Sequence, residues 1–556
     1  MNLKYQWNYF TGLLNRYGFR GLVLKAQERR KSPMHSYSKQ FKRYMPTEEE
    51  IREQRDKPLS YEPMVSIVVP AYETPETYLR ELLESVFMQS YWNWELCIAD
   101  GSKSDAVEKT VEKYADERIH YERLSRNGGI SENTNAGFDM AEGEYLILMD
   151  HDDLLAEHAL YEMVTCLNEC YSKTERQMAM IYSDEDKING NGSVYSRPHF
   201  KPDFNLEFLR RNNYFCHLLM FSKTLLEKAG GLKKEYDGAQ DYDFVLRCVD
   251  AGAIVRHVPK ILYHWRIHEG STAGNSTDKA YAFDNGCRAI EAHLNRCREP
   301  GRAEVTENLG VYRVSYALKG EYELTVAAEN KNQLEQIRKH YENMSFSDKA
   351  YGFKIHYLHI ESLSHGIEKK CSGDYILYIR EDVKVDPQGL LEEFLGICQH
   401  THTAAVSAKL LTAKRRVHSC GLIYDETGNL IGSSGSIPAE YKGYFLHAVI
   451  PQNVSAALFA CVMIRRDAFA KAGGMDYSMA GIYRDADCCF RLQEHGYRIA
   501  VTPEVTAVIG GENEPKDDSA NGREVFYQKW KEKLAEPDPC YNCNLSLKEK
   551  HTYAMK

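Results

Sequence analysis

The alternation of short apolar runs with amphipathic segments constrains the fold of this chain more than any other feature. Residues 65–72 (VSIVVPAY), 94–100 (WELCIAD) and 145–149 (YLILM) are apolar runs bounded by polar residues, which is typical of buried strands. The segment 74–90 between the first two runs carries apolar residues at helical spacing. Strands that alternate with helices form parallel sheets. We therefore expect an α/β fold with a parallel sheet that begins near Pro63.

Polar residues stand at the ends of these three runs. Tyr72 closes the first run, Asp100 ends the second, and residues 150–153 (DHDD) follow the third. In open α/β sheets, ligands bind in the crevice outside the carboxyl ends of the strands. We therefore expect these side chains to converge on one crevice.

The DHDD segment crowds three carboxylates together, which costs free energy unless a cation or a hydrogen-bond network offsets the repulsion. Hard divalent cations such as Mg²⁺ prefer carboxylate oxygens as ligands. Zinc fits less well, because His151 has no cysteine pair and no suitably spaced second histidine beside it. The alternative is an Asp-rich turn in which Asp153 caps the helix that follows.

Four motifs, taken in order along the chain, resemble those of family 2 glycosyltransferases, which are inverting enzymes of the GT-A fold. They are VSIVVPAYE, WELCIADGS, NGGISENTNAGFDMAEGEYLILMDHDD and GAQDYDFVLR, and the resemblance covers residues 63–275. It implies a Rossmann-like parallel sheet. It also implies transfer of a sugar from a UDP- or dTDP-linked donor to a glycan or lipid-linked acceptor in surface-polysaccharide assembly. Mn²⁺ or Mg²⁺ is the implied cofactor, because a divalent cation neutralises the charge that develops on the leaving diphosphate.

The same resemblance implies roles for individual residues. It places Tyr72 and Asp100 at the nucleotide base, with Asp100 accepting from the imino N–H of the base. Many relatives carry two adjacent acids before Gly-Ser, where this chain has ADGS, and we take Asp100 as the remaining one. Asp150 or His151 is expected near the ribose, and Asp152 is expected to hold the metal that bridges the two phosphates. The implied donor-binding residues are Pro70, Tyr72, Glu73, Asp100, Asn127, Asp150, His151 and Arg266.

A catalytic base and a further metal ligand are also implied by the resemblance. Asp241 matches the acid that removes the proton from the acceptor hydroxyl, and Gln240 stands where many relatives have glutamate. The alternative is that Asp241 and Asp243 only cap the helix that follows. His264 matches a histidine that often completes the metal site in related enzymes, although a lone histidine is more often structural. Arg266 is expected to bind a phosphate.

The chain repeats itself imperfectly. GEYLILMDHDD at Gly143 recurs as GDYILYIREDV at Gly373, and GGLKKEYDGAQDYDFVLR at Gly230 recurs as GGMDYSMAGIYRDADCCFRL at Gly473. We therefore expect a GT-A domain followed by a second, degenerate GT-A-like domain. The expected parts are residues 1–62 (a basic and aromatic arm with its linker), 63–305 (the GT-A domain), 320–512 (the second domain) and 513–556 (a C-terminal helix and tail).

The second domain is expected not to turn over a nucleotide sugar. Its first strand ends without the proline and tyrosine of the first domain, and no clear counterpart of the ADGS turn is present. Arg380 replaces Asp150, while Asp382 persists at the position of Asp152 and Asp485 at that of the base. We expect Arg380 to satisfy Asp382 as an internal ion pair without a metal.

Residues 1–45 carry ten basic residues against one acid, interleaved with aromatic and leucine side chains. Two interpretations fit: a segment that contacts an anionic membrane surface, or an arm whose aromatic side chains pack on the main body. No run is apolar enough for a membrane span or a secretory signal, and the 15 scattered cysteines fit reduced thiols, so we expect a cytoplasmic location. The net charge of −10 argues against nucleic acid as a partner.

Cys540 and Cys543 have CxxC spacing near the C-terminus. They lack a second pair for zinc and a thioredoxin-like context for redox chemistry, so we interpret this segment as a docking tail. Three other functions stay open. A nucleotidyltransferase would need a phosphate loop where this chain has PAYETPE at residues 70–76. The others are a non-catalytic carbohydrate-binding scaffold and a transferase with both domains active.

Overall fold

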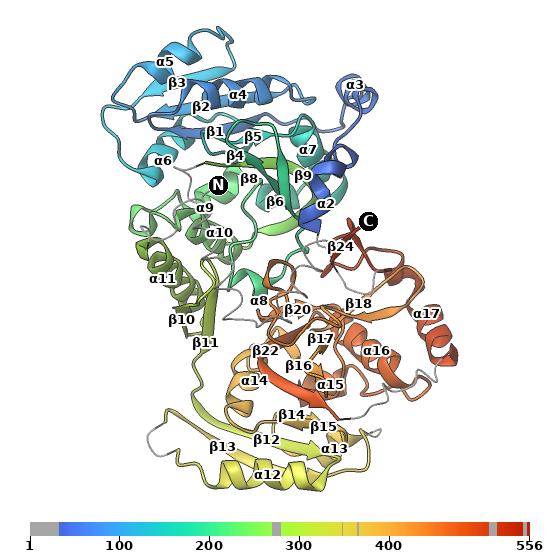
Figure 1. The fold of residues 1–556 in the computed structure, drawn as a ribbon. Coiled ribbons are helices and arrows are strands. Elements are labelled where there is room, and N and C mark those ends of the chain that lie inside the picture. Colours follow the sequence, from blue (N-terminus) through green and yellow to red (C-terminus); the bar gives the residue numbers. More distant parts are fainter. Residues whose placement is uncertain (1–32, 269–279, 347–348, 364–365, 511–519, 549–552) are drawn as a thin grey trace, which may run out of the picture.

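Two mixed sheets, each accompanied by helices, form the body of the molecule (Figure 1). The computed structural model describes residues 33–268, 280–346, 349–363, 366–510, 520–548 and 553–556. We call the part around the first sheet the first region and the part around the second sheet the second region. They are joined by α11 (Ala280–Arg296) and by the hairpin of β10 (Gly301–Val305) and β11 (Tyr312–Tyr316). The predicted α/β fold class, with a second sheet-rich region after the first, is confirmed.

The first sheet has the spatial order β3-β2-β1-β4-β8-β6-β9-β5, and β7 pairs with β6 beside this path. Neighbours among β1 to β4 run parallel, whereas β8 lies antiparallel between β4 and β6. β1 and β2 are buried along their whole length, because helices cover both faces of a parallel sheet. The strands are β1 (Val65–Ala71), β2 (Trp94–Asp100), β3 (Ile119–Arg123), β4 (Tyr145–Leu148), β5 (Leu154–Leu155), β6 (Ala179–Asn189), β7 (Tyr195–His199), β8 (Leu219–Ser222) and β9 (Ile254–Ile267).

The helices of the first region follow from the spacing of their apolar residues. α4 (Glu76–Phe87) buries Leu79, Leu82, Leu83 and Val86, which recur on one helical face. α6 packs against β1 and β2, and Gly137 allows the close approach, since a Cβ there would meet the side chain of Val68. The other helices are α5 (Ala106–Val111), α6 (Ile130–Met140), α7 (Ala159–Cys170), α8 (Leu206–Leu209), α9 (Lys223–Ala229) and α10 (Gln240–Asp250).

The second sheet, in the order β13-β12-β14-β21-β16-β22-β15, repeats the first sheet strand for strand from β2 onward. The directions agree as well: β12 runs parallel to β13 and β14, and β21 lies antiparallel between β14 and β16. In the part of the chain that the structure describes, no strand takes the place of β3. The strands are β12 (Gly320–Ala328), β13 (Tyr351–His359), β14 (Tyr375–Ile379), β15 (Val383–Val385), β16 (Thr403–Thr412), β17 (Val417–Ser419), β20 (Gln452–Val454), β21 (Cys461–Arg465) and β22 (Arg498–Ile509). The helices are α12 (Lys331–Glu342), α13 (Ile367–Lys370), α14 (Leu390–Cys398), α15 (Arg466–Lys471), α16 (Gly481–Glu494) and α17 (Ala520–Leu534).

A glycine precedes the central strand of each sheet for the same steric reason. A Cβ on Gly143 would lie 2.7 Å from the carbonyl oxygen of Met64, and one on Gly373 would collide with the backbone of Glu323. Only glycine lets the chain pass this close to the neighbouring strand. The glycine that opens both copies of the repeated motif is therefore a requirement of the fold.

The N-terminal and C-terminal segments pack together on both regions. α2 (Pro33–Gln40) and the following turn place Tyr37 in an apolar cluster with residues of the first region, the second region and the tail. The ring of Phe41 stacks on Tyr195 at 3.7 Å. For residues 37–44 these contacts favour the packing-arm interpretation, while residues 1–32 lie outside the described residues. None of the described helices combines the length and apolar character needed to cross a membrane.

Candidate active site

The turns after β1 and β2 meet at one edge of the first sheet. The backbone N–H of Glu73 donates to Ser102 Oγ at 2.7 Å. Asp100 is buried at the end of β2, where Oδ1 accepts from Ser102 N at 2.9 Å and Oδ2 accepts from Tyr121 O–H at 2.8 Å. Tyr72 stands beside this turn and is 42% exposed, which leaves its ring available for stacking.

Other predicted donor-binding residues shape the same edge. A Cβ on Gly101 would lie 3.2 Å from Cα of Asn127, so the loop before α6 touches the turn after β2. The carboxylate of Glu73 accepts from Lys103 N and Ser104 Oγ, each at 2.8 Å, and so ties the β1 turn to the β2 turn. Pro70 is buried within β1. The geometry gives Pro70 and Glu73 a role in shaping the turn.

The DHDD segment lies at this edge with its four side chains in different environments. Asp152 Oδ2 lies 2.7 Å from Nε2 of His268. His151 Nδ1 lies 3.0 Å from Thr74 Oγ1 in the turn after β1. The side chain of Asp150 is 47% exposed. The carboxylate of Asp152 and the imidazole of His268 therefore meet at this sheet edge.

Asp153 binds residues of β9 and does not cap a helix. Its carboxylate accepts from Tyr263 O–H at 2.6 Å and from the backbone N–H of Arg266 at 2.7 Å. Burial, together with the charges of Asp150 and Asp152, raises the pKa of Asp153 well above its ordinary value. α7 begins at Ala159 without a side-chain cap, so the capping alternative does not apply here.

The structure corrects the prediction that Arg266 binds a phosphate. Its guanidinium is fully buried and donates to the carbonyl of Asp152 at 2.6 Å, to the carbonyl of Gly190 at 3.2 Å and to Glu81 at 2.6 Å. These partners occupy the guanidinium inside the protein. Arg266 therefore positions the backbone of Asp152 and is not placed to contact a ligand.

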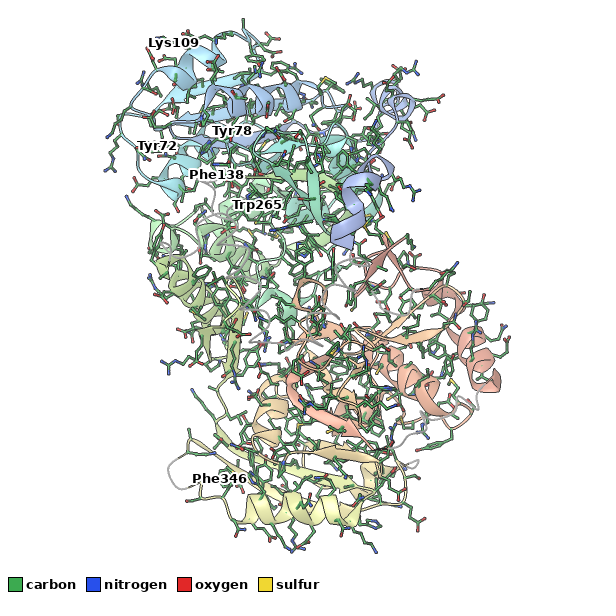
Figure 2. All side chains as sticks on the ribbon, viewed as in Figure 1. Tyr72, Tyr78, Lys109, Phe138, Trp265 and Phe346 are labelled. Atoms are coloured by element: carbon green, nitrogen blue, oxygen red, sulfur yellow. The ribbon has the colours of Figure 1, made fainter. Side chains whose placement is uncertain are left out.

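The structure also places a different histidine at the candidate metal site from the one that the sequence predicted. His264, the residue expected from the sequence, is buried, and its Nδ1 lies 2.6 Å from Oδ1 of Asp186. Its ring packs edge-on against the rings of Phe41 and Tyr195. His268, four residues further along, meets Asp152 instead. Figure 2 labels Tyr72, Tyr78 and Trp265 on the first region, and the ring of Tyr78 lies 5.3 Å from that of His268.

Asp241 lies in the first turn of α10, where burial raises its pKa above the ordinary value. Its Oδ2 accepts from Nδ2 of Asn213 at 3.0 Å. Asp243 differs, because it is fully buried and pairs with Arg247 at 2.8 Å. Ala239 precedes the helix and provides no side-chain cap. Asp241 is thus the acid of this pair that faces a neighbouring loop.

That neighbouring loop, residues 212–218, supplies a site residue that the sequence did not indicate. Nε2 of His217 lies 4.0 Å from Oδ2 of Asp150, and the ring stacks on Tyr263 at 4.7 Å. Burial lowers the pKa of His217 to about 4, so the imidazole is neutral at neutral pH. A single histidine inside the apolar run FCHLLMF carries no recognisable signal. With Asn213 at its other end, the loop spans the distance from Asp241 to Asp150.

In the second region two of the equivalent acids, Asp382 and Asp487, pair with arginines. Arg380 donates to Asp382 through Nε at 2.6 Å and Nη2 at 3.1 Å, which confirms the predicted ion pair. Asp485 is buried and its Oδ2 accepts from the backbone N–H of Phe459 at 2.9 Å. Asp487 pairs with Arg491 at 2.8 Å, as Asp243 pairs with Arg247 in the first region.

The C-terminal CxxC pair is not activated for redox chemistry. Burial raises the pKa of the Cys540 thiol and of the Cys543 thiol. Reactive cysteines have lowered pKa values, because the thiolate is the nucleophile. The segment instead docks on the first region, where Pro539 O accepts from Asp203 N at 2.8 Å.

Comparisons with known proteins relate the first region to a glycosyltransferase family. Residues 66–230 match the family model described as glycosyl transferase family 2. An uncharacterised protein, y4gI, of Sinorhizobium fredii is 30% identical over 87% of this chain and 58% of that protein. The O-antigen biosynthesis protein RfbC of Myxococcus xanthus is 26% identical over 88% of this chain and 41% of that protein. The chondroitin synthase of Pasteurella multocida is 27% identical over 42% of this chain and 24% of that protein.

The chain therefore spans 58% or less of the length of these three relatives. Among solved structures, that of Staphylococcus aureus TarS 1-349 in complex with UDP-GlcNAc is similar at 20% identity and a TM-score of 0.34. This similarity covers 42% of this chain and 67% of that one.

Proposed function

We propose that the chain, in which residues 66–230 match the family 2 glycosyltransferase model, transfers a sugar from a nucleoside-diphosphate donor to a glycan or lipid-linked acceptor. The setting proposed is surface-polysaccharide assembly, since relatives are named for O-antigen biosynthesis and chondroitin synthesis. A UDP- or dTDP-linked sugar is the proposed donor. The observation that carries this proposal is the meeting of Asp152 and His268, 2.7 Å apart, on the sheet edge that also holds the Asp100 turn.

The residues at this edge fit a divalent metal. Asp152 would supply a carboxylate oxygen and His268 an imidazole nitrogen to the ion. Oxygen donors with one imidazole suit Mn²⁺ or Mg²⁺, and the absence of a thiolate argues against zinc in a structural role. When bound, the cation supplies Lewis-acid neutralisation of the charge on the leaving diphosphate.

The protein's own residues then divide the remaining tasks. We assign the nucleotide base to Tyr72 and Asp100, because one side chain offers an exposed ring and the other a fixed acceptor. Asp241 removes the proton from the acceptor hydroxyl, and attack from the face opposite the diphosphate inverts the anomeric carbon. The Asn213 amide donates to one oxygen of Asp241 and fixes the orientation of the carboxylate.

The chain is proposed to comprise four parts, residues 1–62, 63–305, 320–512 and 513–556. The third part, which holds the second region, is proposed to be non-catalytic. Its Arg380–Asp382 ion pair stands where the first region has Asp150 and Asp152. A guanidinium at this position repels a divalent cation. The basic residues of segment 1–45 are proposed to add a peripheral contact with anionic lipid.

A panel assay tests the proposed activity. Purified protein is incubated with UDP-, dTDP- and GDP-linked sugars with and without Mn²⁺, and both nucleotide release and thermal shift are recorded. We expect release to require Mn²⁺ or Mg²⁺ and to favour a uridine or thymidine diphosphate. Release of inorganic diphosphate from a nucleoside triphosphate and sugar phosphate would indicate a nucleotidyltransferase. A thermal shift without turnover would indicate a binding scaffold.

The pH dependence follows from the raised pKa of Asp241. Its pKa is raised by burial, and the carboxylate must be ionised to accept a proton. Activity should therefore fall as the pH drops through this raised pKa, so the acid limb of kcat/KM lies above the ordinary aspartate value. A profile of kcat/KM measured from pH 4 to pH 8 checks this. A limb at the ordinary aspartate pKa or below it would contradict the assignment.

Asp485→Asn tests the second region. Because Arg380 and Asp382 already neutralise each other there, we expect this variant to leave the rate and the product unchanged. The measurement is product size with the natural acceptor, compared with that of the wild type. A shorter product that still carries the first sugar would show that the second region is itself a transferase.

A further inference from the structure

The 212–218 loop links the two chemical parts of the proposed site. At one end Asn213 donates to Asp241 at 3.0 Å, and at the other His217 lies 4.0 Å from Asp150. The position of this loop therefore sets how the proposed base faces the acid cluster. Catalytic geometry of this kind tolerates errors of well under 1 Å.

A buried lysine holds the backbone of the loop. Lys201 is fully buried, and its Nζ donates to the carbonyl of His217 at 2.6 Å and to that of Phe215 at 3.3 Å. It also lies 3.3 Å from Oε2 of Glu185, which in turn accepts from the backbone N–H of His217. Burying an ammonium costs free energy unless its partners are in place. Lys201 and Glu185 thus fix the loop from its carbonyl side and its N–H side.

The backbone of Lys201 is in turn held by the C-terminal tail. The carbonyl of Lys201 accepts from Nδ2 of Asn542 at 2.9 Å, and its N–H donates to Oδ1 of Asp184 at 2.8 Å. The same Asn542 amide lies 2.9 Å from Oδ2 of Asp184. The buried tail residue Asn542 therefore contacts the carbonyl of Lys201 and also the Asp184 carboxylate that accepts from the N–H of Lys201.

The second region anchors the tail and the segment around Lys201. Asp538 in the tail accepts from Ser455 Oγ at 2.5 Å and from the backbone N–H of Tyr424 at 2.9 Å. The hydroxyl of Tyr444 accepts from Phe200 N at 2.9 Å, directly beside Lys201. On the other side, Asn205 and the backbone of Asn453 exchange two hydrogen bonds, at 2.8 and 2.9 Å. Figure 1 shows the C-terminal strand β24 (Ala554–Met555) lying between α2 and the second region.

We propose that Lys201 is a positioning residue for the transfer reaction, and that the second region and the tail serve that reaction by holding Lys201 against the 212–218 loop. The second region then acts as an intramolecular activator: it supports catalysis in the first region without catalysing a reaction itself. The inference rests on the proposed function of the first region. It adds a role for contacts that lie outside the site itself.

Two matched pairs of variants in the full-length chain test this inference. Lys201→Met removes the ammonium that binds the loop. Its control is Lys223→Met, because Lys223 is a part-buried lysine whose Nζ donates to the carbonyl of Ala141 at 2.7 Å, away from the 212–218 loop, the tail and the second region. Asn542→Ala removes the tail contact to Lys201. Its control is Asn544→Ala, because Asn544 binds the carbonyl of Pro259 instead.

The measurements separate positioning from folding. For each variant we measure kcat and KM for Mn²⁺-dependent nucleotide release from the best nucleotide sugar of the panel, binding of UDP with Mn²⁺ by calorimetry, and the unfolding temperature. We expect Lys201→Met to lower kcat by roughly 10²-fold and Asn542→Ala by about 10-fold. UDP–Mn²⁺ binding should stay unchanged, because the Asp100 turn and the Asp152–His268 pair do not contact Lys201.

The outcomes are distinguishable. The inference is supported if kcat falls in both test variants while both controls keep the wild-type kcat at temperatures where they are folded. It is overturned if Asn542→Ala and Asn544→Ala behave alike, and this pair decides the matter should Lys201→Met fail to fold. If the wild type releases nucleotide from no nucleotide sugar, the proposed function fails, and the inference falls with it.

Discussion

Asp152→Asn is expected to lower metal-dependent sugar transfer by roughly 10³-fold while the protein stays folded. The carboxylate is the proposed ligand of the divalent cation, and its Oδ2 lies 2.7 Å from the His268 imidazole. An amide keeps the shape of the side chain but loses the negative charge that a hard cation requires. The measurement is the rate of nucleotide release as Mn²⁺ is raised to saturation, with the unfolding temperature recorded beside it.

The chain supplies a matched control for this substitution. Asp382 stands at the equivalent position in the second region, but its carboxylate is paired with Arg380 at 2.6 Å. Asp382→Asn is therefore expected to leave the metal dependence of transfer unchanged. Normal turnover of Asp152→Asn at saturating Mn²⁺ would refute the metal assignment. Equal losses in both variants would mean that the second region also holds a cation.

Local sequence patterns predicted the strands that form the centre of the first sheet. The apolar runs at 65–72, 94–100 and 145–149 became β1, β2 and β4 with boundaries that differ by one residue at most. A strand that is buried along its whole length is recognisable in the sequence, because most of its positions are apolar. The Arg380–Asp382 pair was predictable for a similar reason, since the two residues are only two positions apart.

Residue roles that depend on long-range pairing were not predictable from the same patterns. His264 and His268 lie four residues apart, and the pairing of β9 with β5 and β6 decides which of them meets Asp152. Arg266 finds its partner Glu81 in α4, far along the chain, so nothing near Arg266 shows that its guanidinium is already occupied. His217 reaches the site on the 212–218 loop, where its carbonyl accepts from Lys201, a residue outside that loop. Such contacts are properties of the packed fold.

Asp241→Asn is expected to lower kcat by roughly 10²-fold or more and to leave donor affinity nearly unchanged. The carboxylate is the proposed proton acceptor, whereas the nucleotide base is assigned to Tyr72 and Asp100 and the metal to Asp152 and His268. An asparagine still accepts a hydrogen bond from Asn213, so the loop is expected to keep its place. The measurement is kcat and KM for transfer, with UDP–Mn²⁺ affinity determined separately by calorimetry.

Asp243→Asn is the comparison that makes this prediction sharp. Asp243 is buried and binds Arg247 at 2.8 Å, so its substitution should lower the unfolding temperature, because it leaves a buried arginine without its anionic partner. It should not remove the chemical step in the protein that remains folded. A collapse of kcat in folded Asp243→Asn, together with an active Asp241→Asn, would move the base by two residues along α10. Loss of kcat in Asp241→Asn, with kcat kept in folded Asp243→Asn, would assign the proton transfer to Asp241. Asp241 is the acid that contacts the 212–218 loop through Asn213.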